Sequence, residues 1–429
     1  MDMGRGGYFT LRCSEQSPPL VPQPMTLFPN LGPTPATSAT SAMAAAKPPR
    51  DFRLDFFRGL ALLFIFVDHI PNNVVSWLTV RNFGFSDATE IFIFISGYSA
   101  MLAYGLTYDR RGFLFASAQV LRRCWQIYVA HIFLVSIFIG HITYISQRYD
   151  NPLFADEMGL AAFVAEPHVT LMQALFLKFK PVNLDVLPLY VVLLAIFPAI
   201  LWGMKKNPFA ALAVSVAIYV LANIFNINLP SYPQGVWFFS PFAWQFLFVI
   251  GAFFCRMRET NLIERLPPAV VMPFAVLYLG LSLFLVATWS NPSLKAYVPQ
   301  ELAKLIYPID KTDLDILRLI HFLSLAYLVA SLVRIDAAFL RWRGLKPIVL
   351  CGQHSLHVFC FGAFLSFAGH FFLTEVNSSR AAQIFVSALG IVTMMTLAAL
   401  LTWYRRQESV VRAAAPIPVT SNFSPERRS

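Results

Sequence analysis

Four ionisable residues lie in or beside the first long apolar stretch of the chain: Asp55, Arg58, Asp68 and His69. Arg58 and His69 are eleven residues apart, so on a helix they share one face about three turns apart, roughly 16 Å along the axis. Ionisable groups at membrane depth are costly and commonly mark functional sites. Here His69 is suited to act as a general base, and Arg58 to bind an anionic group such as phosphate. The simpler interpretations are an interfacial arginine and a hydrogen-bonded core histidine.

The composition is that of a polytopic membrane protein. Of the 429 residues, 57% are hydrophobic and 15% aromatic, whereas only 13% are charged and the mean hydropathy is +0.59. Soluble domains carry about 25% charged residues. The basic residues behind the net charge of +10 lie in short connections between apolar stretches, which argues for membrane topology and against nucleic-acid binding. The five cysteines form no metal-spaced pair, so we expect no metal site and no disulfide framework.

We expect an all-α integral membrane bundle of about ten transmembrane helices with both termini in the cytoplasm. Residues 1–50 are predicted to be a disordered cytoplasmic tail, residues 51–405 the transmembrane domain and residues 406–429 a second cytoplasmic tail. Basic residues concentrate in alternate connections, which places Arg58 on the cytoplasmic side and His69 toward the outer leaflet. The predicted spans are roughly 57–76, 83–105, 121–145, 184–204, 209–226, 236–255, 268–288, 316–333, 347–373 and 381–404.

Pro71 is expected to break or kink the first helix, because it lacks the N–H group that the carbonyl of Val67 would accept from. Irregular backbone at membrane depth is tolerated only against protein or a water-filled cavity, so we expect His69 to face a polar cavity. Adjacent helical residues point about 100° apart. Asp68 therefore need not orient His69, and a carboxylate from another span is the alternative.

The second span carries carboxylates near its outer end, on the same side as His69. Asp87 and Glu90 lie one turn apart there. Two interpretations of Glu90 stay open: it positions a ligand or His69, or it forms a structural ion pair with Arg81 or Arg318. Further polar or small positions of this span are Ser96, Gly97 and Tyr98.

Other spans add basic and polar residues that have both a functional and a structural interpretation. Arg122 and Arg123 open the third span and are either topogenic or, beside Arg58, ligands for the phosphates of a nucleotide-type donor. Polar residues of later spans can line a cavity or hydrogen-bond one helix to another. These are Arg318, His321 and His354.

Several motifs together resemble a known family. Arg58, ten intervening residues and His69 match the arginine–histidine signature of the membrane acyltransferase-3 superfamily, and the segment from Glu90 to Tyr98 is similar to its second-span pattern. Further segments resemble the OpgC-type branch, over roughly residues 50–405. They are Leu54-Asp55-Phe-Phe-Arg58-Gly59, Asp68-His69-Ile70-Pro71, Asn82-Phe-Gly-Phe-Ser-Asp87, Phe242-Ala-Trp244-Gln245, Leu317-Arg318-Leu-Ile-His321-Phe322 and Ser355-Leu356-His357-Val-Phe359.

The resemblance implies a multi-pass enzyme of the bacterial inner membrane that succinylates periplasmic glucans from cytoplasmic succinyl-CoA, with no tightly bound cofactor. It implies that His69 is the catalytic histidine and Arg58 the donor-side arginine. On this basis we expect acyl-CoA to contact Arg58, Arg122 and Arg123, and Asp68 or Glu90 to hold the tautomer of His69. The expected acceptor-binding or cavity-lining residues are Asp55, Asp87, Ser96, Tyr98, Trp244, Gln245, Arg318, His321 and His354.

Some alternatives remain open from the sequence. His69 can act as a general base or form an acyl-histidine intermediate. A secondary transporter or flippase for an organic anion or lipid-linked sugar is the alternative function, since broken spans with charges at membrane depth also suit transport. A purely structural subunit is disfavoured by the number of ionisable residues at membrane depth. The long connections 146–183 and 289–315 are expected to form an acceptor-side vestibule whose aromatic residues stack on sugar rings.

Overall fold

The computed structural model describes residues 51–149, 156–260, 265 and 267–414. This part of the chain is helical, and its only extended pairing is an isolated bridge between Pro230 and Val236. The predicted all-α class is therefore confirmed for the described residues. The predicted tail 1–50 and the last residues of the C-terminal tail, 415–429, lie outside them.

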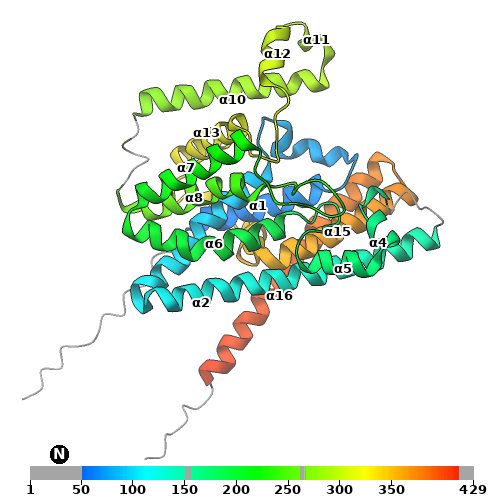
Figure 1. Cartoon of the computed structure of the whole chain (residues 1–429), viewed down its shortest axis with the longest axis horizontal. Helices are drawn as coiled ribbons and strands as arrows, with labels where there is room; N and C mark the ends of the chain where they lie inside the picture. The colour runs from blue at the N-terminus through cyan, green and yellow to red at the C-terminus, as the bar shows by residue number, and fades with distance from the viewer. Residues whose placement is uncertain (1–50, 150–155, 261–264, 266, 415–429) are drawn as a thin grey trace, which may run out of the picture. The chain divides into compact units, whose positions relative to one another are not determined.

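The helices coincide closely with the predicted spans. The long ones are α1 (Phe52–Asp68), α2 (Ala88–Arg148), α6 (Val186–Lys206), α7 (Pro208–Phe225), α8 (Pro241–Arg256), α10 (Pro268–Ser290), α13 (Ile316–Leu332), α15 (Ser355–Glu375) and α16 (Arg380–Ala414) (Figure 1). The short ones are α4 (Ala161–Ala165), α5 (Pro167–Leu175), α11 (Pro292–Lys295), α12 (Gln300–Ile306) and α14 (Lys346–Gln353), with 3-10 turns η1 (Val74–Leu78), η2 (Val80–Asn82), η3 (Arg258–Thr260) and η4 (Ala338–Arg341).

The first helix is shorter than the predicted span 57–76, because α1 ends at Asp68. The N–H of His69 still donates to the carbonyl of Ile65 at 3.1 Å, and that of Ile70 donates to Val67 at 3.3 Å. Pro71 follows and cannot continue this pattern. The break that we expected at the proline thus begins two residues earlier, and it leaves His69 at the helix end.

Two other predicted boundaries need correction. The second and third spans are not among them, because the segment labelled α2 consists of two helices that meet at Gly112, whose φ of 80° and ψ of 175° are not helical. The ninth span is interrupted at His354, between α14 and α15. The last helix continues to Ala414, beyond the end of the predicted span 381–404. Residues 404–414 contain no glycine or proline, so nothing in their backbone chemistry ends the helix earlier.

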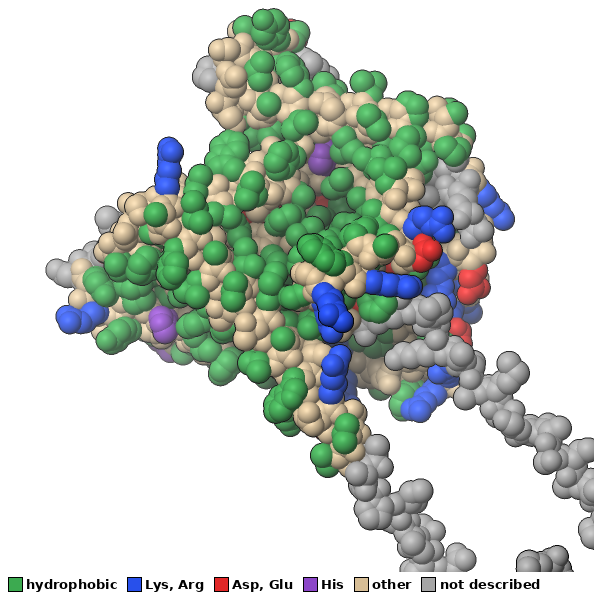
Figure 2. Space-filling model, turned by 180° about the vertical axis from the view of Figure 1, so that it is seen from behind, with side chains coloured by type: hydrophobic (Ala, Val, Ile, Leu, Met, Phe, Trp, Pro, Cys, Tyr) green, Lys and Arg blue, Asp and Glu red, His purple; other side chains and the backbone are tan. Residues whose placement is uncertain are grey.

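Much apolar surface faces outward from the bundle. Six helices of the described part are long and apolar enough to cross a membrane, and α8 and α13 are shorter apolar helices. In the apolar 18-residue stretch of α7 only 17% of the residues are buried inside the protein, and in that of α10 only 22% are. Figure 2 shows one face that hydrophobic side chains largely cover, with most of the visible Lys and Arg side chains near the projecting end of α16. Such a surface needs a lipid environment, so this is a multi-pass membrane protein. The number of crossings and the side of the termini stay predictions.

Glycines bring the helices that carry the candidate site into backbone contact. A Cβ atom on Gly97 of α2 would lie 1.9 Å from the carbonyl oxygen of Phe248 in α8, and one on Gly251 of α8 would lie 2.2 Å from that of Phe94. Small residues allow this close approach between membrane helices. The α1–α14 contact is built in the same way, because a Cβ on Gly59 would meet the backbone of α14 at 1.9 Å.

We predict that Gly97→Ala destabilises the protein by about 1–3 kcal/mol, because the new methyl group forces α2 and α8 apart. The measurement is the thermal unfolding temperature in detergent micelles. Gly140→Ala is the control, since Gly140 also lies within a helix of the segment α2, beyond Gly112, and a Cβ atom added there would meet no other atom within 4 Å. Because alanine has the higher helix propensity, the control is expected to be neutral or stabilising. Equal unfolding temperatures for the two variants would contradict the packing argument.

Candidate active site

A polar cavity of about 400 Å³ lies where the end of α1, the start of α2 and the loop before α13 meet. His69 and Asp68 line it from α1, Asp87 from the start of α2, and Lys311 and Arg318 from the opposite side. His69 thus faces a polar cavity, as the helix break predicts. Other lining residues used below are Arg81, Asn183, Asp185, Phe238, Phe239 and Trp289.

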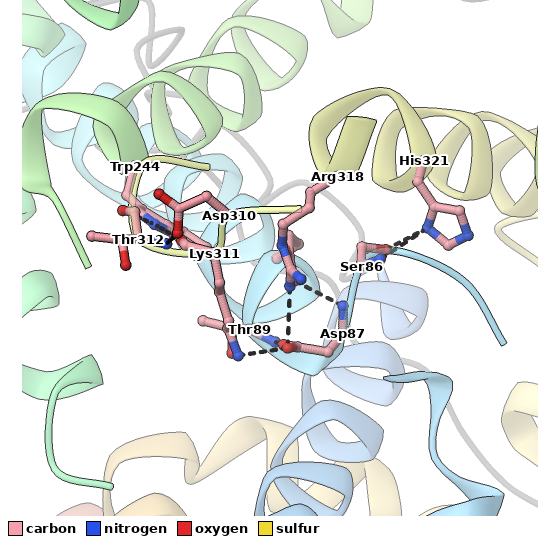
Figure 3. Close-up of polar contacts among 10 residues, drawn as sticks. Ser86, Asp87, Thr89, Trp244, Asp310, Lys311, Thr312, Arg318 and His321 are labelled. Atoms are coloured by element: carbon pink, nitrogen blue, oxygen red, sulfur yellow. Dashed lines mark hydrogen bonds and ion pairs between the residues drawn. The ribbon is translucent and has the colours of Figure 1, made fainter. Parts of the chain in front are cut away.

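A cluster of buried charges forms one wall of the cavity. Asp87 pairs with Lys311 and, at 3.2 Å, with Arg318 (Figure 3). The same guanidinium lies 2.7 Å from the carboxylate of Glu90, which is fully buried. Glu90 also accepts a hydrogen bond from the backbone N–H of Asp87 at 2.9 Å, and the side chain of Asp87 accepts one from the backbone N–H of Glu90, which completes a capping box at the start of α2. The side chain of Asp87 accepts a further hydrogen bond from the backbone N–H of Thr89 at 2.8 Å.

The contacts of Glu90 show one of its two interpretations directly. The structural ion pair with Arg318 is present, whereas the carboxylate makes no contact with His69. Asp68, the other expected partner of His69, accepts a hydrogen bond from the hydroxyl of Thr79 at 2.7 Å. Neither carboxylate therefore touches the imidazole, and their roles in orienting it stay predictions.

Asp87 is surrounded by groups that stabilise its negative charge. Its carboxylate lies beside the ammonium of Lys311 and the guanidinium of Arg318, and it accepts a hydrogen bond from the backbone N–H of Thr89 at 2.8 Å. Contacts with cations and N–H groups favour the ionised form of a carboxyl group. The negative charge on this wall is thus balanced by cations of the protein itself.

The loop that presents Lys311 is fixed from behind by α7 and α8. The indole N–H of Trp244 donates to the carbonyls of Lys311 at 3.1 Å and Thr312 at 3.2 Å, as the labelled residues in Figure 3 show. The hydroxyl of Tyr219 donates to the carbonyl of Leu314 at 2.9 Å. Trp244 is buried and does not line the cavity. In the structure its role is to position the loop that carries Lys311.

Several expected cavity residues instead join helices. His321 Nδ1 lies 2.7 Å from the hydroxyl of Ser86 (Figure 3), Gln245 Nε2 donates to a carbonyl of α7 at 2.9 Å, and His354 Nε2 lies 2.9 Å from a threonine hydroxyl of α16. Only Asp87 and Arg318 of the expected acceptor set line the main cavity. Acceptor binding stays a prediction for the rest, which are Asp55, Ser96, Tyr98, Trp244, Gln245, His321 and His354.

The expected donor-side residues lie away from the cavity. Arg58 Nη2 donates to the α2 backbone at 3.1 Å and to a serine hydroxyl of α2. Asp55 is buried beside it and accepts a hydrogen bond from Gln353 at 3.3 Å. Arg122 is exposed and Arg123 half-buried on the second half of α2, beyond the bend at Gly112. A phosphate site shared by the three arginines stays a prediction.

Some residues that line the cavity were not predicted from the sequence. Two features of the sequence could have pointed to these residues. Lys311 belongs to a charged run before α13, and Asp185 directly precedes the first residue of α6. Burial raises the pKa of Asp185 to about 6, although Lys180 opposes this. Burial likewise lowers the pKa of Lys180 to about 8. Asn183, which lies between these two residues in the sequence, gave no sequence signal at all.

Comparison with known proteins adds one finding. Residues 50–406 match the family model described as OpgC protein. The match covers every helix of the candidate site, from α1 to α15. No curated protein matches the chain.

We predict that Arg318→Met destabilises the protein by about 3–5 kcal/mol, because it leaves the carboxylate of Glu90 buried without its cation. Thermal unfolding in detergent micelles measures this. The control is Arg334→Met, since Arg334 and its partner Asp336 are 82% and 63% exposed, and such a pair contributes about 1 kcal/mol or less. The double variant Glu90→Leu/Arg318→Met is expected to recover much of the loss. Unfolding of Arg318→Met at the wild-type temperature would refute a structural role for the pair.

Proposed function

Because the chain belongs to the OpgC protein family, we propose that it is an inner-membrane acyltransferase that moves a succinyl group from cytoplasmic acyl-CoA to hydroxyls of a periplasmic glucan. The observation that carries the proposal is the position of His69, at a helix end beside a polar cavity of about 400 Å³. Small-molecule sites typically measure about 300–1,000 Å³. The similarity of the Arg58–His69 spacing to the acyltransferase-3 superfamily supports the type of reaction.

The proposed reaction uses the imidazole of His69 as a general base. A ring nitrogen takes the proton of a sugar hydroxyl as its oxygen attacks the thioester carbonyl. The bond between this carbon and the coenzyme A sulfur then breaks, and the sulfur takes up the proton that His69 holds. The products are a sugar ester and free coenzyme A. Attack by the imidazole itself, through an acyl-histidine, gives the same products in two steps.

Aromatic residues at the cavity support a sugar acceptor. Phe238, Phe239 and Trp289 line it beside the charged wall. Trp289 lies in the last turn of α10, at the start of the connection that we expected to form an acceptor-side vestibule. Its indole N–H donates to the hydroxyl of Tyr307 at 2.6 Å. Flat apolar rings with fixed polar edges are suited to stack on sugar rings.

Arg81 supports an acyl group that carries its own negative charge. Its side chain is exposed and lines the cavity with His69. The other two cations of the cavity, Lys311 and Arg318, are both paired with Asp87. Within the described chain no carboxylate lies at ion-pair distance from Arg81. A guanidinium in this state is available for the distal carboxylate of a dicarboxylic acyl group such as succinyl.

We predict that His69→Ala lowers acyl transfer by about 10²–10⁴-fold, the usual contribution of a general base. The measurement is ester label on periplasmic glucan after membranes receive labelled succinyl-CoA. His168→Ala is the control, because His168 is exposed on α5 and does not line the cavity. Equal labelling by wild type and His69→Ala would rule out the catalytic role. Movement of intact substrate across the membrane without release of coenzyme A would favour the transporter alternative.

We predict that Arg81→Gln lowers kcat/KM for succinyl-CoA by about 10–100-fold, as expected for a lost hydrogen bond to a charged group. With acetyl-CoA, which lacks the distal carboxylate, the change is expected to stay below about threefold. The acceptor in both assays is an uncharged glucan oligosaccharide, so only the donor supplies a negative charge. Arg380→Gln is the control, since Arg380 is an exposed arginine remote from the cavity lining. An equal loss with both donors would show that Arg81 does not distinguish the acyl groups.

A further inference from the structure

A second, much smaller cavity is also lined by His69. His69 and Asn183 line both this cavity and the main one, so these two residues form the partition between them. Asn183 has a φ of 68°, in the left-handed region that asparagine tolerates better than most residues. The small cavity measures about 10 Å³, which is about the smallest volume that holds one water molecule.

One nitrogen of His69 has no partner on the protein. Nδ1 is buried, and no hydrogen-bond partner lies within reach of it among the described residues. A buried N–H or ring nitrogen without a partner is costly. A general base also needs its second nitrogen to carry a proton that another group accepts, because this fixes the tautomer.

The small cavity offers groups that can hold a water molecule beside this nitrogen. Ser366 and His370 lie one turn apart on α15, are both buried and both line the cavity. The hydroxyl of Ser366 donates to the carbonyl of Ala363 at 2.9 Å, so its lone pairs remain as acceptors. His370 Nε2 lies 3.5 Å from the carboxylate of Glu157. A buried water is plausible where two to four such polar partners surround it.

We propose that one water molecule in the small cavity accepts the Nδ1 proton of His69 and is held by Ser366 and His370. The proton on Nδ1 leaves the other ring nitrogen, Nε2, as the base that faces the main cavity. Ser366 and His370 are then positioning residues, which act on the reaction only through His69. This inference rests on the proposed function. In it the water molecule, and not Asp68 or Glu90, selects the tautomer of His69.

We predict that Ala363→Val, which fills the small cavity with apolar atoms, lowers kcat for acyl transfer by about tenfold and leaves KM unchanged. Ser366→Ala, which removes a water ligand, is expected to act in the same direction. Ala368→Val is the matched control, since Ala368 lies on the same helix and lines neither cavity.

A second readout does not depend on acyl transfer. The rate at which diethyl pyrocarbonate modifies His69 is measured by mass spectrometry, with the exposed His141 and His357 as internal standards. We expect this rate to fall several-fold in Ala363→Val and Ser366→Ala, because the other tautomer places the proton on Nε2. Unchanged rates in both variants would overturn the proposal. If the wild type transfers no acyl group but the rates fall, the proposed function fails and the orientation by water stands.

Discussion

The ion pairs of Arg318 with Asp87 and Glu90 are the interaction on which the candidate site most depends. They join the start of α13 to the start of α2 across 228 residues of sequence. Removing such charges from water costs several kcal/mol per ion, and the cost is offset only when each charge has several partners. Here Asp87 has two cations and a backbone N–H, and Glu90 has a guanidinium and a backbone N–H. Since the cluster is satisfied from within, it forms a fixed wall and not a group that moves with the substrate.

The other parts of the cavity wall are helix ends, which the packing of the helices brings together. Glycine contacts set α1 against α14 and α2 against α8, and α1 stops at Asp68 just where α2 begins across the cavity. The N-terminal N–H groups of a helix commonly bind anions, but at the start of α2 the protein's own carboxylates take this place. A negatively charged ligand therefore has to be bound elsewhere in the cavity. Arg81 is the lining cation that is not paired with Asp87.

The sequence predicted the helices far better than the contacts among them. Apolar stretches of membrane length are a local property, and each of the ten predicted ranges falls on a helix of the structure. The break after His69 was predictable because proline acts on its own helix. The ion pair of Glu90 remained one of two alternatives, because the choice depends on where α13 packs. The positions of Trp244 and Lys311 were not predictable, since a hydrogen bond between α8 and a distant loop leaves no periodic signal in either segment.

The packing around α1 bears on what the distance between Arg58 and His69 means for the proposed function. Between them the helix is mostly buried, with Leu62 and Phe66 in the core. Under the proposed function, the phosphates of acyl-CoA stay at the Arg58 end, and only its flexible, uncharged pantetheine arm enters the bundle. Three helical turns, roughly 16 Å, are then the length that this arm has to span.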